Sequence, residues 1–219
     1  MITKDFIRQN EAIRTYIRKA DQSMAALGYT EHSFAHVTKV AQFAEDLLLE
    51  LGYPQRTAEL AWIAGYIHDI GNIVNRIDHA QSGAIMAFRI LDKLGCDPEE
   101  LSTIISAIGN HDEGTAFPVN EVAAALILGD KTDVRRSRVR NQDPSTFDIH
   151  DRVNYAVESS QVSLSPDKKS VTLELGIDTS ISPVMDYFEI FLQRMVLCRK
   201  AAEKLNLQFH LLINGQAVL

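Results

Sequence analysis

The sequence contains only two cysteines, Cys96 and Cys198. They provide neither a disulfide framework nor the Cys-x-x-Cys spacing of a structural zinc site. The chain also lacks the apolar run of ~18 residues that a membrane helix needs. Its opening residues, Met-Ile-Thr-Lys-Asp, do not begin a secretory signal. We therefore expect a protein of the reducing cytoplasm that has no membrane partner.

Positive charge is not in excess either. The 22 Lys and Arg residues are outnumbered by 29 Asp and Glu residues, which makes the formal net charge −7. An acidic chain of this kind does not support nucleic acid as a general partner held by phosphate contacts. Internal repeats and low-complexity segments are absent as well. At 219 residues, 46% of them hydrophobic, the chain is long enough to bury a substantial core.

Apolar residues recur at helical spacing through most of the first 130 positions. Several of the apolar stretches end at a glycine, which is typical of helix C-termini. The second helix can be capped by Thr30 or Ser33. We predict helices over residues 3–27, 33–51, 55–70, 79–94, 98–109 and 122–128.

The composition changes after this helical part. A basic run that includes Arg135 and Arg138 is followed by a polar linker over residues 141–148. Residues 161–164 and 171–175 alternate around a Ser-Pro-Asp-Lys-Lys loop, which predicts an antiparallel hairpin. A helix over 183–205 and a strand over 208–213 follow. We therefore predict a mainly α fold: a helical domain over 1–155 and a small α+β C-terminal unit over 156–219.

Imidazole and carboxylate groups stand near the ends of the predicted apolar helices. A lone His-Asp pair often occurs by chance and is then a buried structural pair. A larger set is different, because neutral imidazole and carboxylate bind divalent metals and a carboxylate can bridge two ions. The predicted metal ligands are His36, His68, Asp69, His79, His111 and Asp130. Six such groups are enough for one or two divalent transition metal ions, with Fe, Mn, Zn, Ni and Co all open.

This order of residues resembles the HD-domain superfamily, best known for metal-dependent phosphohydrolases. The similarity lies in the helix histidine His36, the pair His68 and Asp69, and the late helix-terminal Asp130. It covers about residues 30–140 and implies a domain of five or more helices around the site. In the subset with His-Asp-Ile-Gly, two further histidines bind a second metal. The resemblance implies that His79 and His111 do so here.

The resemblance further implies hydrolysis of a phosphate ester or anhydride, with a nucleotide or another small phosphorylated metabolite as substrate. His68 and Asp69 would be the catalytic pair. Many relatives have a lysine directly after His-Asp-Ile-Gly, where this chain has Asn72. An amide binds phosphate without the strength of an ammonium group. Besides Asn72, we therefore predict that Lys131 and Arg135 bind substrate, with Arg135 one helical turn beyond Lys131 if the helix continues.

Two other functions remain open at this point. The same four histidines and two aspartates in HD-type proteins support di-iron oxygenases, and a non-catalytic sensor could use the metal only to shape a ligand pocket. His32 lies one turn before His36 and can reach a substrate, whereas His150 and His210 are predicted on the surface or in the hairpin unit. The oligomeric state also stays open, a homodimer included.

Overall fold

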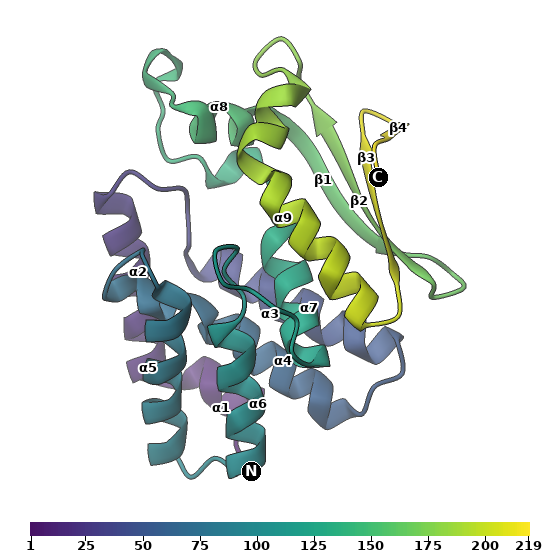
Figure 1. Cartoon of the computed structure of the whole chain (residues 1–219). Helices are drawn as coiled ribbons and strands as arrows, with labels where there is room; N and C mark the ends of the chain where they lie inside the picture. The colour runs from purple at the N-terminus through teal and green to yellow at the C-terminus, as the bar shows by residue number, and fades with distance from the viewer.

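A computed structural model describes all 219 residues, and it is mainly helical with a small sheet near the C-terminus (Figure 1). The predicted fold class is confirmed. The α-helices are α1 (Lys4–Gln9), α2 (Glu11–Ala26), α3 (Phe34–Glu50), α4 (Gln55–Ile67), α5 (His79–Lys93), α6 (Pro98–Gly109), α7 (Glu121–Lys131), α8 (Ile149–Ala156) and α9 (Val184–Lys204). The strands are β1 (Val157–Leu164), β2 (Ser170–Ile177), β3 (Gln208–Ile213) and β4 (Gln216–Ala217). No helix combines the length and the apolar character that a membrane crossing requires.

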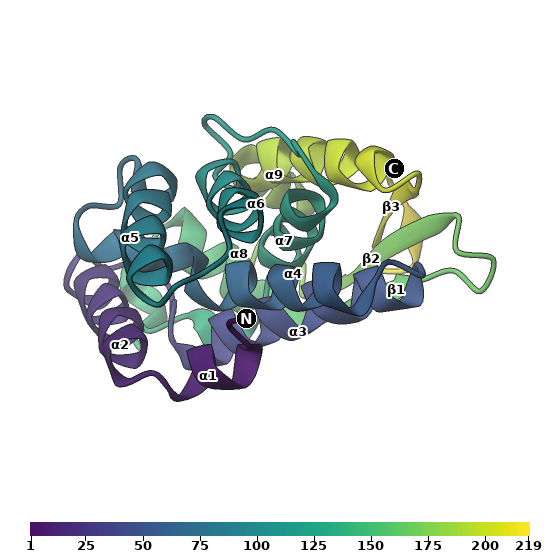
Figure 2. The ribbon, with the colours of Figure 1, turned by 90° about the horizontal axis from the view of Figure 1, so that it is seen from below.

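Helix α4 forms the centre of the bundle. Every residue from Leu60 to Ile67 is buried, so the helix is covered on all sides. It packs between α3 on one side and α6 and α7 on the other (Figure 2). Gly65 permits this arrangement, because a Cβ there would lie 2.8 Å from the Ala41 Cα of α3. The end of α4 is thereby held in the middle of the bundle.

Two predicted helices have different boundaries. The helix expected over 3–27 is divided at Asn10, whose extended backbone ends α1 and whose side chain accepts a hydrogen bond from the Ile13 N–H to start α2. The helix expected over 55–70 ends at Ile67, and residues His68–Ile73 form a 3₁₀ helix, η1. The His68-Asp69 pair therefore lies on this tighter turn.

A third difference concerns the region after α7. This helix ends at Lys131. The helix therefore does not continue to Arg135, and Arg135 does not lie one helical turn beyond Lys131. Short 3₁₀ turns, η2 (Arg136–Arg138) and η3 (Pro144–Thr146), lead instead to α8, a helix that the sequence patterns did not predict. Asp148 begins α8 by accepting a hydrogen bond from the Asp151 N–H.

The C-terminal unit contains a four-stranded sheet in the order β1-β2-β3-β4. The predicted hairpin is present, with Val162 opposite Leu173 in an antiparallel pair. Strands β2 and β3 are parallel, and α9 makes the crossover that such a pair needs. Helix α9 packs on these strands and also on α7 (Figure 1). One continuous hydrophobic cluster therefore runs from the bundle into the sheet.

The start of α5 lies unusually close to η1, at Gly71. A Cβ at this position would be 2.0 Å from the His79 carbonyl oxygen and 2.5 Å from the Gly83 nitrogen. Both are backbone atoms, which cannot move aside as a side chain can. The absence of a side chain at Gly71 thus sets the distance between the His68-Asp69 turn and the helix that carries His79.

We expect Gly71→Ala to lower the free energy of unfolding by about 1–3 kcal/mol, because the added methyl group pushes α5 away from η1. Urea denaturation of the two proteins measures the difference. Gly109→Ala is the matched control, since its Cβ would meet only the Ala84 Cβ at 3.6 Å, an ordinary contact. Equal loss of stability in both variants would contradict the role given to the close approach at Gly71.

Candidate metal centre

The six predicted ligands come together in the interior of the bundle. They belong to elements far apart in the chain: the first turn of α3, the turn η1, the start of α5, the second residue after the end of α6 and the last turn of α7. The side chains are His36, His68, Asp69, His79, His111 and Asp130, and all are buried. Because each stands at or near a helix end, its polar group can reach a common centre without breaking the apolar packing along the helices.

A hydrogen bond at Nδ1 orients each of the four imidazoles. The Nδ1 atoms of His68, His79 and His111 lie 2.8, 3.0 and 2.6 Å from the carbonyl oxygens of residues 65, 76 and 108. His36 Nδ1 lies 2.8 Å from Asp133 Oδ2. Carbonyl and carboxylate oxygens only accept, so each Nδ1–H must donate. A ring held in this way, when it carries no proton on Nε2, directs the Nε2 lone pair toward the centre, as metal-binding histidines do.

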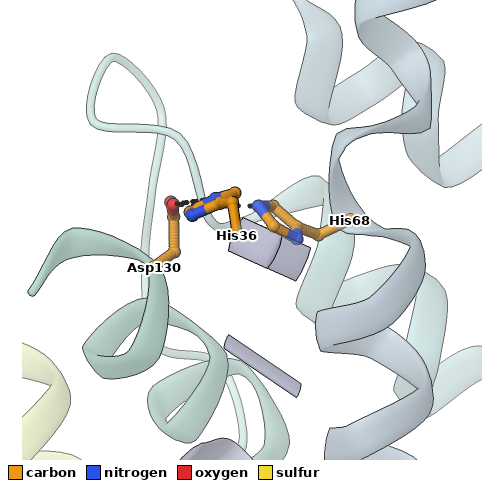
Figure 3. A group of neighbouring side chains, drawn as sticks. All are labelled: His36, His68 and Asp130. Atoms are coloured by element: carbon orange, nitrogen blue, oxygen red, sulfur yellow. Dashed lines mark ion pairs between the residues drawn. The ribbon is translucent and has the colours of Figure 1, made fainter. Parts of the chain in front are cut away.

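The first group of ligand atoms consists of His36, His68 and Asp130. Their metal-capable atoms all lie within 4.8 Å of one another. Asp130 Oδ1 is 3.3 Å from His36 Nε2 and 3.7 Å from His68 Nε2. Figure 3 shows the two rings and the carboxylate directed toward one another. Two imidazole nitrogens and a carboxylate oxygen at this separation can hold one divalent ion.

The second group lies on the other side of Asp69. His68, Asp69 and His111 also offer ligand atoms within 4.8 Å of one another. His79 Nε2 is 3.2 Å from His111 Nε2 and 3.7 Å from Asp69 Oδ1. Asp69 Oδ2 faces the first group instead, 3.6 Å from His36 Nε2. One carboxylate thus presents one oxygen to each group, which is the arrangement of a bridging ligand.

The donor atoms fit a metal, because several of them have no other partner. His36 Nε2, His68 Nε2 and Asp69 Oδ2 are buried and make no hydrogen bond. Leaving a buried polar atom unpaired costs about 1–3 kcal/mol, so native proteins rarely do it without a reason. Three such atoms facing one point are explained by a cation that binds all of them.

The charge balance of the centre also favours a cation. Burial by itself would lower the pKa of His68, but the negative charges of Asp69 and Asp130 raise it to about 10. Burial would raise the pKa of Asp130, yet Lys131 and the histidines hold it well below its usual range. The two carboxylates are therefore ionised, and they favour positive charge between them whether a proton or a metal supplies it.

Asp133 orients His36 of the first group through the ring nitrogen that points away from the centre. The sequence patterns did not predict this residue as part of the site. Its side chain is fully buried and accepts hydrogen bonds from His36 Nδ1 at 2.8 Å, Lys39 Nζ at 2.7 Å and Arg135 Nε at 2.9 Å. The only local signal was its position three residues after Asp130. His36 is 97 residues away in the chain, so the contact itself could not be read from spacing.

A cavity of about 420 Å³ opens onto the centre. Asp69, His79 and Asp130 belong both to the ligand groups and to its wall. Four cationic side chains from the rest of the chain also line it: Arg76, Lys131, Arg138 and Arg194. Arg194 comes from α9, so the C-terminal unit contributes to the wall. A small anion that enters this cavity would meet the ligand groups and positive charge together.

The three predicted substrate-binding residues have different positions. Lys131 lines the cavity, but its ammonium group already pairs with Asp130 at 2.7 Å and with Glu113 at 3.1 Å. Asn72 is outside the cavity wall and donates a 2.8 Å hydrogen bond to Asp69 Oδ1. Arg135 is outside it as well, because its guanidinium pairs with Asp133 and Glu31.

Two histidines that we left out of the ligand set line the cavity. The His32 ring lies 5.6 Å from the His36 ring, and burial keeps its pKa well below the usual value, so it is neutral. His150 is exposed and stands on α8, the helix that was not predicted. His210 lies on β3, apart from the cavity. In the sequence, the only indication that His32 lies near the site was its position four residues before His36, at the start of a predicted helix.

Comparison with known proteins agrees with this arrangement. An uncharacterized protein of Methanocaldococcus jannaschii is 24% identical over 194 residues, which cover 78% of this chain and 74% of the relative. The HD domain family matches residues 33–149, a span of 117 of the 219 residues that contains all six candidate ligands. HD domains are in general metal-dependent hydrolases that bind divalent ions. With more than half of its length matched, this chain belongs to the HD-domain family.

Proposed function

We propose that this protein is a phosphohydrolase that acts on a small phosphorylated metabolite, a nucleotide included, with the help of one or two divalent metal ions. The observation that carries the proposal is the set of three buried, unpartnered ligand atoms beneath a cavity lined by four cationic side chains. Metal ligands alone would serve many reactions. Their combination with cations on one cavity wall favours a substrate that carries negative charge.

The residues of the centre would divide the work. His36, His68 and Asp130 would hold one ion, His79 and His111 would hold a second, and Asp69 would contact both. When bound, a divalent ion supplies Lewis acidity, which makes water a nucleophile near neutral pH and stabilises charge on phosphoryl oxygens.

The surrounding side chains keep the ligands in place. Asn72 holds Asp69 Oδ1, and Lys131 pairs with the Asp130 oxygen that does not face His36. Arg138 donates to the carbonyl oxygens of Glu31 and Asp133, so the chain segment behind His36 is held against the start of α3. Positioned ligands of this kind lower the cost of organising the reacting groups.

We expect the purified protein to contain stoichiometric transition metal and to hydrolyse at least one member of a panel of nucleotides, sugar phosphates and other small phosphate esters. Metal analysis and a phosphate-release assay on the same preparation test this. Chelation should abolish release, and adding back the metal should restore it.

Two results would contradict the proposal. Consumption of dioxygen by an iron-loaded protein that releases no phosphate would assign it to the di-iron oxygenases. Tight binding of a phosphorylated compound without turnover under any metal would indicate a sensor.

A further inference from the structure

Three of the four cationic side chains in the cavity wall are already committed to other groups. Lys131 pairs with two carboxylates, as described above. Arg194 Nε lies 2.5 Å from Glu113 Oε1, on the other side of the same carboxylate. The Arg138 guanidinium donates hydrogen bonds to two backbone carbonyl oxygens, and its Nη1 lies 3.7 Å from Asp133 Oδ2. These groups shape the positive wall, but an incoming anion would have to compete with their present partners.

Arg76 differs from the other three because no carboxylate pairs with it. Its guanidinium lies 3.3 Å from Asn72 Oδ1 and 3.2 Å from His79 Nε2, and about 5.9 Å from the centre of the Tyr29 ring. Both hydrogen-bond acceptors are neutral, and charge-assisted pairs with an anion are roughly twice as strong as neutral ones. Arg76 is therefore the cation in this wall that gains most from an anionic ligand.

The contact with His79 has a second consequence. His79 Nδ1 already donates to the Arg76 carbonyl oxygen, so Nε2 holds the only lone pair that the ring can offer to a metal. In this structure the Arg76 guanidinium donates to that same lone pair. An ion on His79 and the present position of Arg76 exclude each other, both because of the shared lone pair and because of charge repulsion.

We propose that Arg76 is the residue that binds the phosphate group of the substrate, and that it becomes free for this when His79 takes up the second metal ion. The proposal rests on the proposed function, which it deepens by naming the group that recognises the anion. The planar guanidinium presents parallel N–H donors that match two phosphate oxygens, whereas an ammonium group acts as a point charge without this fixed geometry. It replaces Lys131 and Arg135 as the main phosphate contact.

If Arg76 has this role, Arg76→Ala should change the affinities for phosphate and for the second metal ion in opposite directions. The affinity for inorganic phosphate in the metal-loaded protein should fall about ten- to a hundredfold, the usual effect of losing a charge-assisted contact. The affinity for the second Mn²⁺ ion should rise, because the competing cation is gone. The backbone carbonyl that orients His79 remains in the variant, so a loss of ligand geometry is not expected.

Calorimetric titration with Mn²⁺, and then with inorganic phosphate, measures both affinities. Arg76→Lys keeps the charge and should show an intermediate loss of phosphate affinity. Arg89→Ala is the control, since Arg89 is an exposed arginine of α5 without an ion pair, and it should bind both ligands as the wild type does.

Phosphate affinity of Arg76→Ala within twofold of the wild type would overturn the proposal. A parallel loss of Mn²⁺ would do so too, since Arg76 would then only support the metal site. Failure of the proposed function looks different. In that case the wild type would bind phosphate through Arg76 but hydrolyse no phosphorylated compound.

Discussion

Replacing Asp69 with alanine should deplete both metal ions and lower kcat/KM for the phosphorylated substrate by about three orders of magnitude or more. Asp69 Oδ2 faces His36 and His68, and Oδ1 faces His79, so Asp69 is the one ligand that offers a separate atom to each group. Without it, each group would lose an anionic ligand. Metal analysis of the purified variant and steady-state kinetics at saturating metal give the two numbers.

His79→Ala is the informative comparison for Asp69→Ala. Of the two ligand groups, His79 Nε2 faces the second, with His111 Nε2 at 3.2 Å and Asp69 Oδ1 at 3.7 Å. Its loss should therefore remove about half of the metal from a fully loaded two-ion protein. Unchanged stoichiometry in His79→Ala would instead indicate a single ion held by His36, His68, Asp69 and Asp130. Full metal content in Asp69→Ala would contradict the bridging role.

Asp133→Ala should have the second large effect, on stability and metal affinity together. The carboxylate is completely buried among Lys39, Arg135 and Arg138, and its removal leaves these cations without their common partner. Breaking a buried ion pair in this way costs about 3–5 kcal/mol of unfolding free energy. His36 also loses the acceptor that orients it, which typically weakens metal binding by about 10–100-fold.

The pH dependence of the free energy of unfolding distinguishes the contribution of the Asp133 charge from that of its packing. Burial would raise the pKa of Asp133, but hydrogen bonding to His36 and the charge of Arg138 hold it well below the usual range. A carboxyl whose pKa is lower in the folded protein stabilises it fully above the unfolded pKa, ~4, and loses this contribution as the pH falls further.

The stability difference between wild type and Asp133→Ala should therefore be largest near neutral pH and shrink below about pH 4. Urea denaturation across this pH range measures it. Asp133→Asn, which keeps an acceptor for His36 but removes the charge, should retain more metal affinity than Asp133→Ala. A stability difference independent of pH would show that packing alone is lost.

Local patterns in the sequence determined much of this protein. Apolar spacing and terminal glycines predicted the helices from α3 to α7, the hairpin, α9 and β3, because these signals depend on residues within a few turns of one another. The same patterns placed six ligand-type side chains near helix ends. The chemical nature of imidazole and carboxylate then indicated a metal, and the order of the residues resembled the HD domain before any contact was known.

Only the tertiary structure decided what surrounds those ligands. Asp133 meets His36 across 97 residues, and Arg76 rather than Arg135 reaches the cavity, because α7 ends at Lys131 and the chain then turns back to pair Arg135 with Asp133. Spacing along one helix specifies which side chains share a face. It does not specify which distant element packs against that face, since this depends on how all the helices bury their apolar surfaces together.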